Sequence, residues 1–367
     1  AIETGLTDPS TMGAANVLAG NLTAEEGSTL TITGTEGSSL TVGGALSADT
    51  LVVEAGTLKA QSGATVADLS IADAAAMEVA AGQTIDLTRG AIDGTLSGGE
   101  DSVLNIGSEV SVGADGSVAG FDVEIAENAK LALAGMLAAN DLKGGSSAEI
   151  VGDGGTLSLA GTGSYAGTLS GSGTMEVLSG SSMSLNNATA SSDWSIYNEG
   201  SMLIDLTESG SLTLSRLSLG AESDTTVRLN SDNGMEGLLT LGDLIIEEGA
   251  DITMASTGAG QLAAGRQYTI GTVGGYEGAD ELKLSFSGTA FSQWDKVNTK
   301  VFIDENGNII IDAVKAGTNP LAETANHANA KAGAALLWDA EAPVGGELEA
   351  AYNAVNDMIA DGKTAAA

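Results

Sequence analysis

Short alternations of apolar and polar residues recur along the chain from about residue 17 to residue 255. Residues 29–33 (TLTIT), 51–54 (LVVE) and 211–214 (SLTL) are typical copies, and a corner containing Gly, Asp or Ser follows most of them. Successive side chains of a strand point to opposite sides, so this alternation predicts strands with one buried face. The predicted strands are about four to six residues long and about ten residues apart, a spacing that also fits a β-sandwich or barrel.

Three features of the array favour a right-handed parallel β-helix, or solenoid, over residues 1–264. The pattern continues without change for longer than one sandwich needs. Few corners carry the Asn-Gly or Asp-Gly pair of a two-residue hairpin, so consecutive strands are expected to turn a corner rather than fold back. Aromatic residues make up 3% of the chain and hydrophobic residues 43%, which suits a narrow interior of stacked Ala, Val, Ile and Leu side chains.

The pattern changes over residues 265–316, where we predict strands that close the end of the solenoid. Residues 301–304 (VFID) and 309–312 (IIID) flank Glu305-Asn306-Gly307-Asn308, whose Asn-Gly centre is a strong hairpin signal. A calcium loop using Asp304, Asn306 and Asn308 is the rival interpretation. That loop requires its glycine at the sixth position, and here the glycine is the fourth residue.

The last segment, residues 317–367, is predicted to be helical and to lead towards a membrane barrel. Asn319-Pro320 provides an N-cap followed by proline at the first helical position. Leu348, Tyr352, Val355 and Ile359 form the apolar stripe of a second, amphipathic helix. Two helices joined by residues 343–346 (PVGG) is the simplest arrangement.

The net charge of the chain limits the kinds of partner that it can bind. The chain has 49 acidic and 13 basic residues and a formal net charge of −36. Nucleic acids and anionic membranes are bound by Lys/Arg patches, so neither is expected as a partner. A chain this acidic repels its own copies, and we expect a monomer. There is no cysteine, so disulfides do not stabilise the fold.

The C-terminal part carries a family resemblance. A Ser/Thr/Gly-rich strand array is followed by Trp294-Asp295, the Asn-Gly hairpin, residues 329–338 (NAKAGAALLW) and an acidic helix at 348–356. This order resembles the junction between passenger and translocator in autotransporters (type V secretion) with autotransporter-associated β-strand repeats. The resemblance implies a β-helical passenger exported through a C-terminal outer-membrane barrel of the same gene product. It also implies that the chain stops just before the barrel. The N-terminal residues 1–4 (AIET) lack an initiator Met and the basic and apolar regions of a signal peptide, so we expect a mature or excised segment.

The sequence offers little catalytic chemistry. The only histidine is His327, in the predicted helical segment, and the absence of cysteine excludes thiol catalysis. Asp122 and Glu124 are predicted to project from one strand face and could serve as the carboxylate pair of a glycan-cleaving enzyme. Acids alternate with aliphatic residues throughout the chain, so a solvated outer face is the simpler interpretation. Trp194 and Tyr197 form the only aromatic cluster in the array, and we expect local packing rather than a sugar platform.

We therefore predict an all-β protein with no catalytic, cofactor-binding or metal-binding residue and no cofactor. The expected function is that of a non-enzymatic, structural or adhesive passenger at the bacterial cell surface, anchored at the outer membrane and contacting an unknown glycan or protein ligand. The alternative is a secreted β-helical enzyme that cleaves polysaccharides with a carboxylate pair. A third possibility is a spacer without a ligand.

Overall fold

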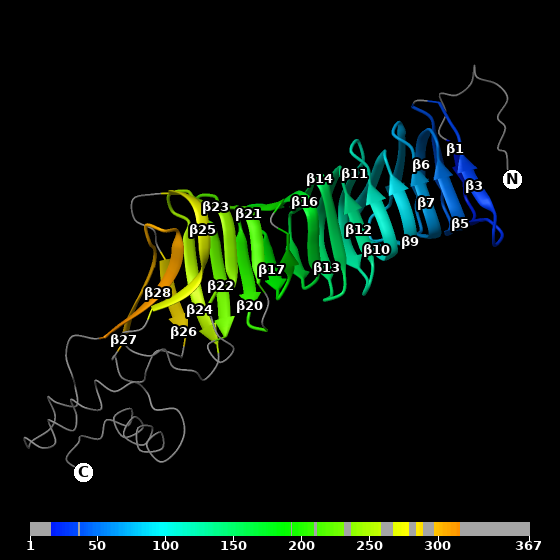
Figure 1. The fold of residues 1–367 in the computed structure, drawn as a ribbon. Coiled ribbons are helices and arrows are strands. Elements are labelled where there is room, and N and C mark those ends of the chain that lie inside the picture. Colours follow the sequence, from blue (N-terminus) through cyan, green and yellow to red (C-terminus); the bar gives the residue numbers. More distant parts are fainter. Residues whose placement is uncertain are drawn as a thin grey trace, which may run out of the picture.

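The described part of the chain is a long parallel β-solenoid of about 10 turns (Figure 1). The computed structural model describes residues 16–35, 37–191, 193–208, 211–230, 236–257, 267–278, 284–288 and 297–315. The predicted helical segment 317–367, with His327, lies outside these residues, and no described residue is helical.

The described residues form one sheet of 28 strands. The strands are β1 (Asn16–Leu18), β2 (Leu22–Thr23), β3 (Thr29–Ile32), β4 (Ser39–Val42), β5 (Leu46–Val53), β6 (Gly56–Ala60), β7 (Ala64–Ile71), β8 (Ala75–Val79), β9 (Thr84–Ile92), β10 (Thr95–Val112), β11 (Ser117–Ile125), β12 (Lys130–Leu133), β13 (Met136–Gly144), β14 (Glu149–Leu159), β15 (Thr162–Tyr165), β16 (Thr168–Val177), β17 (Ser182–Asn186), β18 (Thr189–Ala190), β19 (Asp193–Asn198), β20 (Ser201–Leu206), β21 (Leu212–Leu219), β22 (Asp224–Asn230), β23 (Leu239–Ile246), β24 (Asp251–Thr257), β25 (Gln267–Gly278), β26 (Leu284–Gly288), β27 (Val297–Ile303) and β28 (Asn308–Lys315).

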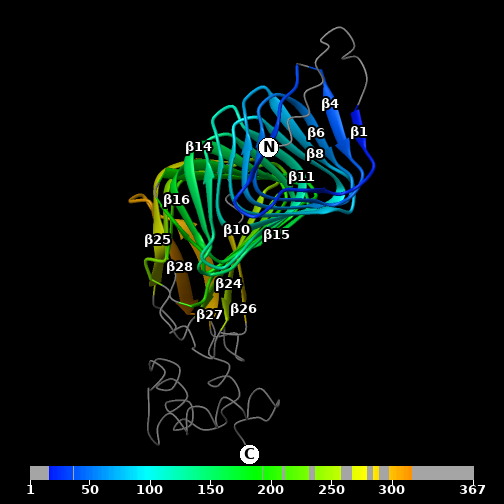
Figure 2. The same cartoon turned by 90° about the vertical axis from the view of Figure 1, so that its right-hand side faces the viewer.

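Each coil contributes to three faces, and each face is a stack of parallel strands. In one coil the faces are residues 85–87, 89–92 and 95–98, and in the next they are 103–106, 109–112 and 117–119. We call them the first, second and third face. Figure 2, turned towards the N-terminal end, shows the coils behind one another around a common interior. The predicted parallel solenoid is confirmed.

Aliphatic columns fill the interior. On the first face, Ile85, Leu104, Val123 and Leu142 are successive register partners, and each is at most 1% exposed. Every coil adds one residue to each column, so apolar surface is buried mainly against the neighbouring coil.

Three large aromatic side chains enter this interior, each beside a glycine of a neighbouring coil. The three largest fully buried side chains of the described residues are all aromatic. A Cβ atom on the glycine of the preceding coil would come within 2.6–2.8 Å of the aromatic ring. The missing glycine side chain therefore provides the space for the ring. The pairs are Gly98 with Phe121, Gly144 with Tyr165, and Gly173 with Trp194.

Charged residues on the outside are aligned with opposite charges. Every Lys and Arg in the described part of residues 16–257 has an Asp or Glu as its register partner in an adjacent coil. Opposite charges side by side favour one register over its slipped alternatives. The pairs are Lys59 with Glu78, Arg89 with Asp68 and Glu109, Lys130 with Glu109 and Glu149, Lys143 with Glu124, Arg216 with Asp243, and Arg228 with Asp205.

An antiparallel hairpin covers the C-terminal end of the solenoid. Strands β27 and β28 pair around residues 304–307, and β28 also pairs antiparallel with β25. Ile309 and Ile311 of this hairpin are buried, and Ile303 packs against the core. The Asp304 carboxylate accepts hydrogen bonds from the backbone N–H groups of Asn306 and Asn308 at 2.9 and 2.8 Å. The predicted hairpin is confirmed, and this carboxylate closes the turn.

Candidate functional site

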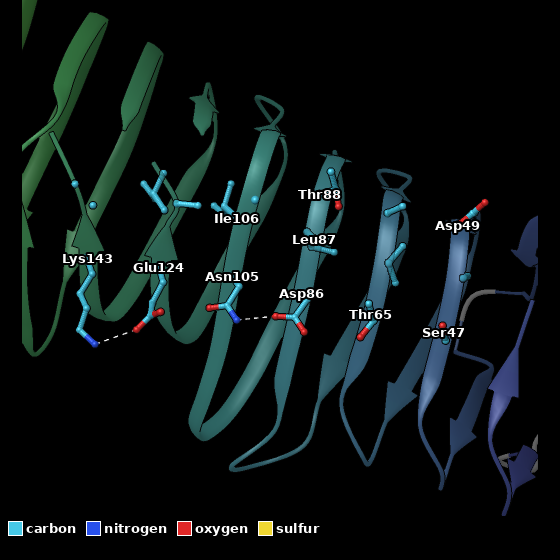
Figure 3. Close-up of a pocket in the computed structure, with 18 of the residues that line it drawn as sticks. Ser47, Asp49, Thr65, Asp86, Leu87, Thr88, Asn105, Ile106, Glu124 and Lys143 are labelled. Carbon is cyan, nitrogen blue, oxygen red and sulfur yellow. Dashed lines mark hydrogen bonds and ion pairs between the residues drawn. The ribbon is translucent and has the colours of Figure 1, made fainter. Parts of the chain in front are cut away.

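A groove lined by both polar and apolar residues runs along the corner between the first and second faces, parallel to the solenoid axis (Figure 3). It has a volume of about 960 Å³, and residues of eight successive coils line it. We call it the axial trough. Its side wall is a row of outward residues on the first face, and its floor is the corner itself. The row contains Ser47, Thr65, Asp86, Asn105, Glu124, Lys143 and Ser164, and the floor contains Asp49, Ala67, Thr88, Gly107, Ala126 and Gly145.

The trough exists because this corner differs in length from coil to coil. In β5, β7 and β9 the strand continues through the corner, and a single residue, Asp49, Ala67 or Thr88, makes the bend. The coil before them needs residues 24–28 to turn the same corner, and later coils need residues 126–129 and 145–148. The exposed residues of these longer turns stand above the short corners between them. The short corners of β5, β7 and β9 lie in the N-terminal part of the trough, and Ala126 and Gly145 of the longer turns continue its floor.

The side wall presents one polar side chain per coil. Its seven members are successive register partners along the stack. Since neighbouring strands lie ~4.8 Å apart, the row repeats a polar group at that interval over a length on the order of 30 Å. Figure 3 shows six of these side chains projecting in line from consecutive strands.

Two contacts link neighbours within the row. The Asn105 Nδ2 group donates a hydrogen bond to Asp86 Oδ1 at 2.6 Å, and Lys143 Nζ lies 2.9 Å from Glu124 Oε1. The hydrogen bond to Glu124 raises the pKa of Lys143 above its ordinary value. These contacts join four of the seven side chains of the row into two pairs.

Acidic groups outnumber basic ones around the trough. Its lining contains Glu26, Asp49, Asp86 and Glu124, and Lys143 is the only basic residue among them. The Asp49 carboxylate accepts a hydrogen bond from the Gly27 backbone N–H across the floor. No aromatic residue lines the trough. The site therefore offers hydrogen bonds and an excess of acidic groups, with no aromatic ring for stacking.

The two carboxylates considered from the sequence do not form an isolated pair. Asp122 and Glu124 both project outward from β11, on either side of the buried Val123. Glu124 lies in the side wall, bound to Lys143, and Asp122 is not among the lining residues. Within the described residues, no group of three or more His, Asp or Glu could hold a metal ion.

The two aromatic residues of β19 face opposite ways. Trp194 is 0% exposed, and its Nε1–H group donates to the Ser170 carbonyl oxygen at 2.8 Å. Tyr197 points outward and donates to Glu199 Oε1 at 3.0 Å, a bond that raises the pKa of the tyrosine. Trp194 is therefore a packing residue, as expected, and the two rings form no sugar platform.

Comparison with known proteins identifies no relative of this chain. No family model, curated protein or solved structure matches the chain. In the part of the chain that the structure describes, there is no helix with the length and apolarity needed to cross a membrane. The function must therefore be argued from the solenoid and its axial trough.

Proposed function

We propose that this chain is a non-enzymatic, structural or adhesive passenger, displayed on the surface of a bacterium with an outer membrane. It would be exported through an outer-membrane barrel of the same gene product and remain anchored there. The observation that supports this proposal most is the parallel solenoid of about 10 turns with polar outer rows and a hairpin at its C-terminal end.

The architecture suits export in an unfolded state. Each coil is stabilised by its neighbours, so the fold can grow coil by coil once one end is formed. The hairpin of β27 and β28 covers the interior at the C-terminal end and can serve as that first layer. The chain has no cysteine, so folding outside the cell requires no disulfide formation.

An adhesive role follows from the repetition of weak contacts. The rows of Ser, Thr, Asp and Asn side chains repeat along the rod at the interval between coils. Several weak contacts made together bind more strongly than any one of them, provided that the spacing of the ligand allows simultaneous engagement. A rigid rod supplies such a fixed spacing.

The enzymatic alternative receives less support. A carboxylate pair that cleaves glycosidic bonds requires one acid and one base or nucleophile on opposite sides of the scissile bond. Glu124 is bound to Lys143, and the trough has no aromatic wall to hold a sugar ring. Release of reducing ends from any polysaccharide, abolished by Glu124→Gln, would favour the enzyme instead.

Surface labelling of intact cells tests the display. The full-length gene product should carry an export signal and a C-terminal barrel. An epitope inserted at the exposed turn of Asn128 should be reached by antibody and by protease on unbroken cells. Deleting the barrel should abolish labelling. An epitope reached only after lysis would contradict the proposal.

A further inference from the structure

The geometry points to the axial trough as the binding site for a neutral, linear glycan that lies parallel to the solenoid axis. This inference rests on the proposed adhesive function and names its site and ligand class. It is carried by three properties of the trough: its charge, its pattern of donors and acceptors, and its finite length along the axis.

The charge of the trough excludes polyanionic ligands. Glu26, Asp49, Asp86 and Glu124 line it, and Lys143 offsets one of them. The whole chain carries a net charge of −36, which adds to the repulsion. Uronic-acid polymers, sulfated glycans and nucleic acids would all bring further negative charge into this field. The ligand should therefore not be anionic.

The lining also disfavours a polypeptide. A peptide that adds to a sheet needs a free strand edge, but β7, β9, β10 and β11 are each paired on both sides through the trough. A peptide held by its side chains needs pockets for aromatic or large apolar anchors. The floor is made of small residues such as Ala67, Gly107 and Ala126, and no aromatic side chain lines it.

Sugar hydroxyl groups match the side wall. The carboxylates of Asp86 and Glu124 can only accept hydrogen bonds, and each hydroxyl of a sugar can donate one. Ser47, Thr65 and Lys143 can donate to hydroxyl and ring oxygens in return. The row offers such a group in every coil, so a straight polymer can make one contact per coil as it runs along the axis.

The finite length of the trough predicts how affinity depends on ligand length. Its lining runs from Glu26 in the first contributing coil to Ser164 in the last. Affinity should rise as an oligosaccharide is lengthened to span these residues. It should then level off, because further units lie beyond the lining.

The test measures binding of the 367-residue chain to length series of neutral linear oligosaccharides. The probes are β-linked gluco-, manno-, xylo- and galacto-oligosaccharides, with oligogalacturonate as the anionic comparison and a polylysine peptide as the cationic polypeptide comparison. The blocking variant is Thr88→Trp, because Thr88 is exposed at the centre of the floor. The matched control is Thr95→Trp, which places the same side chain on the third face. Unfolding midpoints establish that both variants fold.

Binding of at least one neutral series, weakened about ten-fold or more by Thr88→Trp and unchanged by Thr95→Trp, is the expected result. Equal binding by all three proteins would place the glycan elsewhere and overturn the inference, while the adhesive proposal would stand. Binding to oligogalacturonate or to polylysine in preference to every neutral series would overturn the ligand class. Failure to bind any neutral series, on a protein that is labelled on intact cells, would overturn the inference and leave surface display standing.

Discussion

Replacing Gly173 by alanine should destabilise the solenoid because the added methyl group would collide with a ring in the next coil. The three atoms nearest to a Cβ on Gly173 all belong to the Trp194 ring, at 2.8–3.0 Å. Trp194 is fully buried and is the register partner of Gly173. The contact therefore depends on the stacking of these two coils.

The magnitudes follow from overpacking and from cavity formation. Gly173→Ala should cost about 1–3 kcal/mol of unfolding free energy, as other insertions into a packed core do. Trp194→Ala should cost about 3–5 kcal/mol because it leaves a large cavity. In the double variant the new methyl group occupies emptied space. The destabilisation of the double variant should therefore be smaller than the sum of the two single values by about 1–3 kcal/mol.

Urea unfolding followed by far-UV circular dichroism measures these values for the wild type, both single variants and the double variant. Gly20→Ala is the control, because a Cβ there would meet nothing within 4 Å. The control should shift the free energy of unfolding by no more than about 0.5 kcal/mol. Additive effects of Gly173→Ala and Trp194→Ala would mean that the two residues do not touch, and would refute the stacking register.

Substitutions at two further positions test the outer rows and the closing hairpin. Arg89→Glu should destabilise the solenoid by about 1 kcal/mol, and Arg89→Gln by less, because the new carboxylate would lie beside Asp68 and Glu109. Equal destabilisation by the two substitutions, or a destabilisation that does not depend on salt concentration, would argue against charge alignment. Hydrogen bonds from Asn308 hold the pKa of Asp304 below its ordinary value. The stabilisation that this carboxylate gives to the hairpin is therefore complete above about pH 4, and it is lost as the pH falls through the lowered pKa. Amide exchange of the hairpin should therefore be faster in Asp304→Ala than in the wild type at neutral pH and equal in strong acid; a difference that persists in acid would contradict this.

The fold class was accessible from the sequence because its strongest signals are local. The alternation in segments such as residues 51–54 comes from one buried and one solvated strand face. The hairpin at residues 304–307 comes from the conformational preference of Asn-Gly. Both depend on neighbouring residues only, so no knowledge of long-range pairing was needed.

Strand lengths could not be predicted, because they depend on how each corner is made. The sequence indicated strands of about four to six residues, yet β10 has 18. The chain remains in extended conformation through corners of one or two residues, such as those at Thr88 and residues 107–108. The difference between a short and a long corner has no strong residue signature.

The axial trough could not be predicted either, because its side wall depends on the register between coils. Its side wall consists of residues that are far apart in the sequence, such as Asp86, Asn105 and Glu124, and only the coil register brings them into line. A signal was nevertheless present. Asp68, Arg89, Glu109, Lys130 and Glu149 alternate in charge at nearly constant spacing, and this spacing could have supplied the register.

Distances between spin labels on the side wall test most directly whether the chain winds around one axis. The chain has no cysteine, so only introduced cysteines would be labelled. Pulsed electron paramagnetic resonance on the pairs Thr65/Lys143, Ser47/Lys143 and Ser47/Ser164 should give separations of about 19, 24 and 29 Å, one strand spacing of ~4.8 Å for each added coil. Separations that do not grow by an equal step from pair to pair would contradict a solenoid with one side-wall residue per coil.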